Sequence, residues 1–456
     1  MELMRWENLL NSDRLGVKHE SKVENGYENH FSNDKDRILF SKEMRILQGK
    51  TQVFSMADEY VRNRYSHSLE VSSVGRRIGN VIKGEMFAKN RYMNFDPKYD
   101  FASLIESACL CHDIGHPPLA HVGESAIRVW FAESQLAKKV FDKIDDERLK
   151  NDFLHYEGNA QNFRLLSRLM KNYNKGGLQL TLGTLASVAK YPCDSSFSID
   201  NKIKHAGFKK HGFFYDDAES FRAVAEGTGL IPVNTSSLAW YRHPLSYIVE
   251  AADDICYSII DIEDAVKMRC VGYQEAIDLI IGIAGEKNAS RIKNIVGNQE
   301  KIEEIREIAI KKMVSEVGEI FVSHESDFLG GCFSGDLISK TSYAENILKL
   351  KEFARKNIYV STPAVSIRAA GYSMIEGLLN GFVGAVEDLN DRGDRCSSKS
   401  RMFVTLAEKY LLDKKGLVSR DPYKRLLSVT DLISSMSDKQ AIDIYRTISG
   451  QSLSSY

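Results

Sequence analysis

Residues 104–124, LIESACLCHDIGHPPLAHVGE, join an apolar segment to a cluster of polar side chains. The part from Leu104 to Cys111 is a continuous apolar-rich segment and predicts a buried helix. Gly115 and the Pro117-Pro118 pair interrupt a helix, so we expect a turn after this segment. The turn would hold three histidines and two carboxylates at the end of a buried element.

The flanking sequence predicts an all-α fold. Apolar residues recur at three- and four-residue spacing over residues 37–132, 157–173 and 244–285 and through most of 287–456. Residues 174–240 carry many Gly, Lys and aromatic residues with weak periodicity, which is typical of short helices and loops. Strand-like alternation is rare, and we expect at most a small hairpin near residues 47–56 or 208–216.

Three parts are expected along the chain. Residues 1–36 form a polar, loosely ordered lead-in, and residues 37–285 form the core with residues 174–240 as an insertion. Residues 286–456 form a helical region that packs on this core.

Composition narrows the class of protein. The 456 residues include 61 basic and 62 acidic side chains, so the whole chain has no electrostatic footprint for nucleic acid. The seven cysteines include no CxxC pair, no signal peptide is apparent, and no run of 18 apolar residues occurs. We therefore expect a cytoplasmic protein with reduced thiols and no membrane contact.

The turn after Cys111 carries the residues that suggest chemistry. His112 and Asp113 are adjacent, and His116, His121 and Glu124 follow. Helix capping would explain a lone His-Asp pair, but packing needs no such concentration of imidazoles and carboxylates. Imidazole plus carboxylate suits a divalent metal.

Further candidate ligands lie elsewhere in the chain. His67 follows Arg64 by one helical turn, although a lone histidine there would more often be structural. Asp253, Tyr257 and Asp261 are spaced four residues apart and would form a stripe about 12 Å long on one helix face. Taken alone, such acids would most simply be solvated.

Together these residues resemble a known family. The order His67, His112-Asp113, Asp253 resembles the HD-domain metal-dependent phosphohydrolases. The segments that narrow the resemblance to bacterial deoxyguanosinetriphosphate triphosphohydrolases are LQGKTQVF (47–54), RYSHSLEV (64–71), HDIGHPP (112–118), EGNAQ (157–161), RHPL (242–245) and ADDICY (252–257). WENLL (6–10) and DLISSMSDKQA (431–441) also fit, so the resemblance covers nearly the whole chain.

The resemblance implies one divalent metal per subunit. Its ligands would be His67, His112, Asp113 and Asp253. Mg²⁺ or Mn²⁺ is expected first, with Fe²⁺, Ni²⁺, Co²⁺ and Zn²⁺ as alternatives.

The family's reaction would be displacement at the α-phosphorus of a deoxynucleoside triphosphate, with release of intact triphosphate. His121 is expected to be the acid/base group and Glu124 its partner, because a carboxylate can hold an imidazole in one tautomer. His116 would contact phosphate or support the metal ligands.

The resemblance also implies a substrate pocket. Tyr257 would pack on the sugar at C2′, Asp261 would accept a hydrogen bond from the 3′-hydroxyl, and Gln48 would approach the sugar or base. The residues expected to contact the phosphates are Arg64, Asn159, Lys190, Tyr191 and Lys210. From the sequence without the resemblance, the simpler interpretation of Lys190 and Lys210 is solvated surface charge.

Two departures from the family pattern affect substrate preference. Leu119-Ala120 stands where relatives often have Phe-Gly, and residues 193–206 match no pattern that we can place. The expected substrate is a dNTP, with dGTP first. The alternatives are another HD-type nucleotide phosphohydrolase and an effector-regulated nucleotide- or single-stranded-DNA-binding protein. The family further implies a homo-oligomer, expected to be a hexamer, with single-stranded DNA as a further partner.

Overall fold

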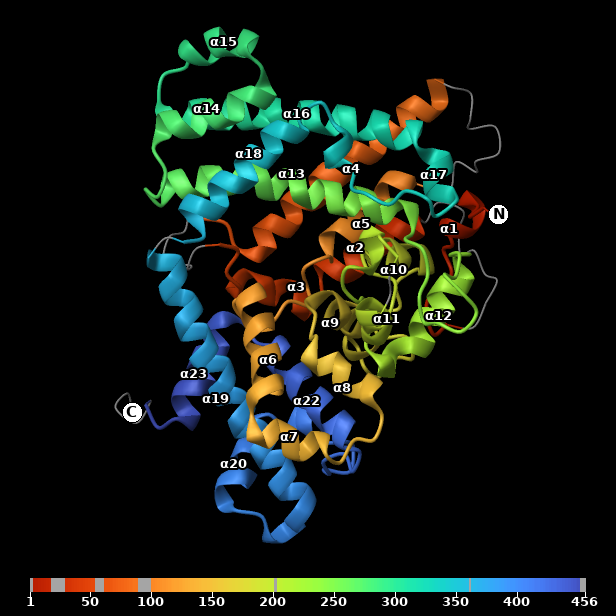
Figure 1. Cartoon of the computed structure of the whole chain (residues 1–456), viewed down its shortest axis with the longest axis vertical. Coiled ribbons are helices and arrows are strands. Elements are labelled where there is room, and N and C mark those ends of the chain that lie inside the picture. The colour runs from red at the N-terminus through yellow and green to blue at the C-terminus, as the bar shows by residue number, and fades with distance from the viewer. Residues whose placement is uncertain are drawn as a thin grey trace.

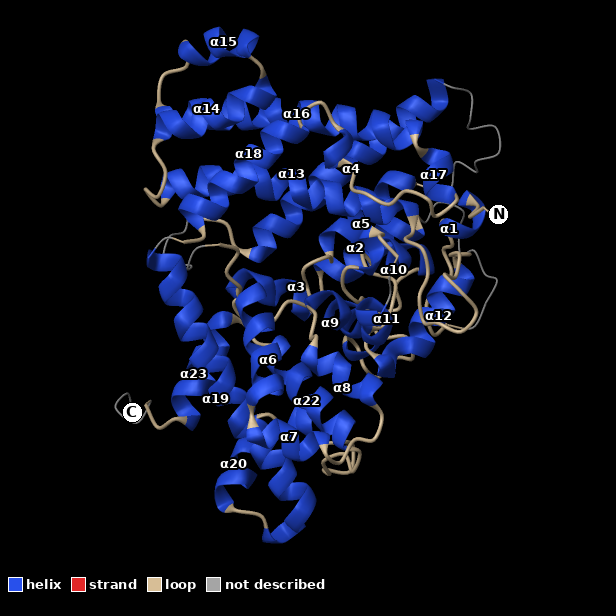
Figure 2. Ribbon diagram, viewed as in Figure 1, coloured by secondary structure: helices blue, strands red, loops and turns tan. Residues whose placement is uncertain are grey.

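Helices form the framework of the computed structural model, which describes residues 3–17, 29–53, 61–88, 100–200, 203–360 and 362–451. No β-strand occurs in these ranges, so the all-α prediction is confirmed (Figure 2). The prediction of a small hairpin was wrong within the described residues. 3₁₀ turns occupy Leu47–Gly49, Ala206–Phe208 and Tyr215–Asp217, and only isolated bridges remain, such as the one between Thr51 and Asn63. Residues 54–56 lie outside the described ranges.

The helices of the N-terminal part include those that carry the turn after Cys111. They are α1 (Trp6–Leu9), α2 (His30–Leu39), α3 (Lys42–Ile46), α4 (Arg64–Ala88), α5 (Phe101–Leu110), α6 (His121–Glu133), α7 (Gln135–Phe141), α8 (Glu147–Leu154) and α9 (Gly158–Arg164).

The middle of the chain contains the insertion and the helices that follow it. They are α10 (Leu182–Val188), α11 (Ser195–Asp200), α12 (Ala218–Gly227), α13 (Pro244–Lys267), α14 (Tyr273–Ala284), α15 (Ala289–Lys293), α16 (Asn298–Ser323), α17 (Glu325–Leu329) and α18 (Ala344–Phe353). The C-terminal helices are α19 (Thr362–Arg392), α20 (Ser398–Leu406), α21 (Glu408–Leu411), α22 (Pro422–Ser434) and α23 (Asp438–Ile448).

Helix α5 lies at the centre of the larger hydrophobic core. All ten of its residues are buried, and α2, α4, α10 and α13 pack around it. Asp100 begins the helix because its side chain accepts from the backbone N–H of Ser103. Helices α4 and α13 therefore meet the end of α5, where the turn with the histidines begins (Figure 1).

A second hydrophobic core lies in the lower part of the view (Figure 1). Helices α6, α7 and α8 contribute to it with α19, α22 and α23. The long helix α19 packs against α6 and α22, and so joins the C-terminal helices to the helix that begins at His121.

Each of the two cores contains residues from more than one of the three expected parts of the chain. The boundary expected at residue 36 falls inside α2, and Leu9 and Leu10 of the lead-in are fully buried. The larger core extends along the chain as far as Ile358. Among the described residues, no helix is both long enough and apolar enough to span a membrane.

Candidate active site

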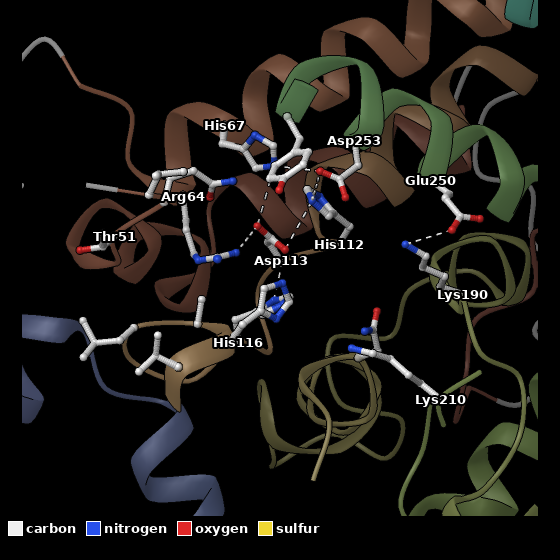
Figure 3. Close-up of a pocket in the computed structure, with 18 of the residues that line it drawn as sticks. Thr51, Arg64, His67, His112, Asp113, His116, Lys190, Lys210, Glu250 and Asp253 are labelled. Atoms are coloured by element: carbon white, nitrogen blue, oxygen red, sulfur yellow. Dashed lines mark hydrogen bonds and ion pairs between the residues drawn. The ribbon is translucent and has the colours of Figure 1, made fainter. Parts of the chain in front are cut away.

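One cavity of about 420 Å³ lies where α4, the turn after α5, α13 and the insertion meet (Figure 3). Residues from widely separated parts of the chain line it: Thr51, Gln52, Val53, Arg64, His67, His112, Asp113, His116, Leu119, Ala120, His121, Val122, Asn159, Val188, Lys190, Tyr191, Lys210, Ser246, Val249, Glu250, Asp253, Tyr257, Tyr359, Ile367 and Arg368. Twelve of the fifteen residues expected at the site line this cavity, and Glu124 bonds to His121, which lines it.

The four expected metal ligands come together on one wall. Nε2 of His67 lies 3.1 Å from Oδ1 of Asp253, and Nε2 of His112 lies 3.7 Å from the same oxygen. Oδ1 of Asp113 lies 3.4 Å from Nε2 of His112. Figure 3 shows these side chains converging from α4, α13 and the turn after α5.

The donor set fits a divalent cation. Ligand atoms of His67, His112 and Asp253 lie within 4.8 Å of one another. Nδ1 of His112 lies 2.7 Å from the carbonyl of Cys109, which fixes the ring and leaves Nε2 pointing at the other ligands. That Nε2 is buried without a hydrogen-bond partner, as an atom reserved for a metal would be.

Electrostatics at these ligands favours an added positive charge. Burial by itself would lower the pKa of His112, but Asp113 and Asp253 raise it to about 9. Burial would raise the pKa of Asp113, and Arg64 with the nearby imidazoles lowers it instead. The carboxylates therefore attract either a proton on His112 or a metal ion, and the two compete.

A second group of side chains lies beside the metal ligands. Nδ1 of His121 lies 2.9 Å from Oε2 of Glu124, and the other oxygen of Glu124 accepts from the backbone N–H of Gly158 at 2.9 Å. Nε2 of His116 lies 3.7 Å from Oε1 of Glu124. An added Cβ at position 158 would lie 2.5 Å from this carboxylate, so a larger residue there would displace Glu124. The His-Glu pair is therefore built into the start of α9 as well as α6.

Four arginine and lysine side chains line the cavity, and three of them are held by carboxylates. Arg64 pairs with Asp113, Lys190 lies 3.2 Å from Glu250, and Nζ of Lys210 lies 2.8 Å from Glu157. Burial would lower the pKa of both lysines, and their carboxylate partners raise it, so the two ammonium groups stay charged. Tyr191 and Asn159 also line this side, and the Asn159 amide donates to Glu157.

Of the three residues expected to contact the sugar or base, only one lines the cavity. Tyr257 lines the cavity and stacks on Tyr359, with ring centroids 6.1 Å apart. Asp261 is 1% exposed and does not reach the wall: it lies 2.5 Å from Arg62 and accepts from the Tyr359 hydroxyl at 2.8 Å. Gln48 is exposed and also lies off the wall, where Gln52 stands instead.

Sequence reasoning missed several residues of the cavity. Tyr359 and Arg368 lie about a hundred residues beyond Tyr257, and no local spacing joins them to it. Glu250 could have been found, since it precedes Asp253 by one helical turn on α13. Within the described part of the unplaced segment, residues 193–200 and 203–206, none lines the cavity.

Comparison with known proteins agrees with this geometry. The HD domain family matches residues 64–170, which contain His67, His112 and Asp113. A deoxyguanosinetriphosphate triphosphohydrolase-like protein of Synechocystis is 35% identical over 99% of this chain and 100% of its own length. A protein of the same description from Pseudomonas aeruginosa is 34% identical over 98% of this chain and 99% of its own. A deoxyguanosinetriphosphate triphosphohydrolase of Salmonella paratyphi A is 29% identical over 92% and 93%, respectively. The chain therefore belongs to the deoxyguanosinetriphosphate triphosphohydrolase family of HD-domain proteins.

Proposed function

We propose that this protein hydrolyses deoxynucleoside triphosphates, with dGTP as the first expected substrate, to deoxynucleoside and intact triphosphate. The observation that carries the proposal is that one cavity combines the convergent ligand set of His67, His112, Asp113 and Asp253 with four basic side chains and a tyrosine pair. A triphosphate carries roughly four negative charges and needs such cations. A sugar ring needs an apolar face of the kind that Tyr257 presents.

The metal would be held by His67, His112, Asp113 and Asp253. A divalent ion there would polarise the phosphate and lower the pKa of a bound water. Mg²⁺ or Mn²⁺ suits the carboxylates, while two imidazoles also admit Fe²⁺, Ni²⁺, Co²⁺ or Zn²⁺.

His121 would supply the proton that the O5′ leaving group requires. Its Nδ1 is held by Glu124, so Nε2 is the ring nitrogen left for proton transfer. Burial alone would raise the pKa of Glu124, but its hydrogen bond with His121 and the nearby imidazole of His116 outweigh burial and lower it, so the carboxylate stays ionised. His116 lines the cavity between this pair and Asp113 and would contact phosphate.

The residues on the cavity walls suggest which groups would contact the phosphates and the sugar. Arg64, Lys190, Lys210, Tyr191 and Asn159 would surround the phosphates. Tyr257 would pack on the sugar. Tyr359 lines the cavity and donates a hydrogen bond to Asp261. Asp261 would therefore reach the sugar either through Tyr359 or after Tyr359 moves. The Gln48 contact with sugar or base stays a prediction that this conformation does not provide.

Product analysis tests the function. Each dNTP and GTP would be incubated with the protein in Mg²⁺ and then Mn²⁺, and the products separated by chromatography. We expect deoxynucleoside plus intact triphosphate, fastest from dGTP. A dNMP or dNDP product would instead favour another HD phosphohydrolase, and no product with any dNTP mixture would favour a nucleotide- or single-stranded-DNA-binding role. The hexamer, the DNA contact and the cytoplasmic location stay predictions.

A further inference from the structure

The C-terminal helix α23 reaches the active-site cavity through one buried carboxylate. Asp438 is its first residue, and its side chain is buried. Its Oδ2 accepts from the backbone N–H of Thr51 at 2.8 Å, and its Oδ1 accepts from that of Leu119 at 2.9 Å. Both partners line the cavity. One carboxylate thus bonds to two cavity walls that lie more than 300 residues before it in the chain.

A buried lysine makes a second connection between the same parts. Lys50, which precedes Thr51, is 2% exposed. Its Nζ donates to the carbonyl of His116 at 2.6 Å and to that of Ser434, the last residue of α22, at 2.8 Å. The turn from His116 to Leu119 is therefore held at one end by Lys50, which also bonds to Ser434 of α22, and at the other end by Asp438 of α23.

This turn has a conformation that needs outside support. Leu119 has φ of 60° and Ala120 has φ of 51° with ψ of −121°, which residues with a Cβ adopt only where the surroundings hold them. Ala120 immediately precedes His121, the first residue of α6. The direction in which His121 enters the cavity therefore depends on this strained turn.

We propose that Asp438 is a positioning residue that holds the turn at Leu119 and the Thr51 segment in the arrangement that aims His121 at the reacting phosphate. Asp438 lies outside the cavity wall and acts through the two backbone N–H groups. The proposal rests on the proposed function for the role of His121, but the hold on the two segments is a separate physical claim. It makes docking of α23 a condition for a competent active site.

Asp438→Asn is the matched test because the amide keeps the shape but turns an NH₂ group toward one of the two N–H donors. Asp443→Asn is the control, since Asp443 lies on the same helix and is exposed. Hydrogen–deuterium exchange by mass spectrometry would follow peptides over residues 47–53 and 117–123. We expect faster uptake in both peptides for Asp438→Asn and none for Asp443→Asn. Unchanged uptake in both would overturn the proposal.

Steady-state kinetics supplies the second readout. We expect kcat of Asp438→Asn to fall by about tenfold or more while KM stays within about threefold, because the phosphate-binding cations are untouched. Faster exchange with an unchanged kcat would overturn the positioning role. A wild-type protein without turnover would count against the proposed function only, because the exchange readout judges the hold independently. Should Asp438→Asn fail to fold, Lys50→Met tests the same turn, with faster uptake over residues 114–121 as the supporting result and unchanged uptake as the contrary one.

Discussion

His121 and Glu124 are one turn apart on α6 but differ in exposure: the imidazole side chain is 74% exposed and the carboxylate side chain 1%, with Nδ1 and Oε2 2.9 Å apart. A buried carboxylate can hold an exposed imidazole in a fixed orientation while the other ring nitrogen faces the cavity. This relationship is the basis of the first prediction.

Glu124→Gln should lower kcat by about 100-fold with little change in KM. The neutral amide cannot stabilise the imidazolium, and general acid–base catalysis contributes about 10²–10⁴-fold. Steady-state kinetics on dGTP would measure both parameters. Glu133→Gln, at an exposed position on the same helix, is the control. Equal kcat values for Glu124→Gln and wild type would remove the pair from the mechanism.

His112→Ala should abolish stoichiometric binding of Mn²⁺, because it deletes the orphaned Nε2. Metal content after dialysis, measured by inductively coupled plasma mass spectrometry, would show the loss without an activity assay. The exposed His30 supplies the control variant His30→Ala. Binding by wild type should also strengthen from pH 6.5 to pH 8.5, because Asp113 and Asp253 raise the pKa of His112 to about 9 and a proton there competes with the metal. Full metal content in His112→Ala would place the metal elsewhere.

Tyr257→Ala should relax discrimination against ribonucleotides. The stacked rings of Tyr257 and Tyr359 limit the space at one wall, and truncation would leave room for a 2′-hydroxyl. The measured quantity is the ratio of kcat/KM for dGTP to that for GTP, which we expect to fall by about tenfold or more, since one steric contact is worth about 1–3 kcal/mol. A ratio equal to that of wild type would remove Tyr257 from the sugar site.

Asp152→Asn should change how stability depends on pH. Asp152 is fully buried and accepts from the Ser195 hydroxyl, the Tyr215 backbone N–H and the Tyr423 hydroxyl. Within the described ranges, no lysine or arginine forms an ion pair with it. Burial raises its pKa to about 7, although these hydrogen bonds oppose the rise. The folded state therefore binds a proton more tightly than the unfolded state.

The sign of the effect follows from that proton. The stabilisation is fully present below the ordinary pKa of an aspartate and is lost as pH rises toward 7, by at most about 1.4 kcal/mol per pH unit. The free energy of unfolding of wild type minus that of Asp152→Asn should therefore fall between pH 5 and pH 8, as urea titrations would show. Buried histidines with lowered pKa, such as His211 and His243, act in the opposite direction, but they cancel in this difference. A difference that rises with pH would contradict the assignment.

The sequence by itself determined the helical class of the fold and the residues of the turn after α5. Both depend on local spacing: periodic apolar residues bury one helix face, and Gly115 with Pro117 ends the helix where the histidines follow. The spacing of Asp253 and Tyr257 likewise placed both on one face of α13, and the structure has both at the cavity.

Only the tertiary structure decided which distant groups meet at this turn. Tyr359 bonds Asp261, which pairs with Arg62, and Asp438 bonds the backbone at Thr51 and Leu119. An aspartate or tyrosine far along the chain is by default half-exposed and solvated, so its type and local pattern do not reveal a partner hundreds of residues away. The contacts of Asp438 exist because α19 packs against α6 while α22 and α23 pack against α19, and that packing is a property of the whole chain.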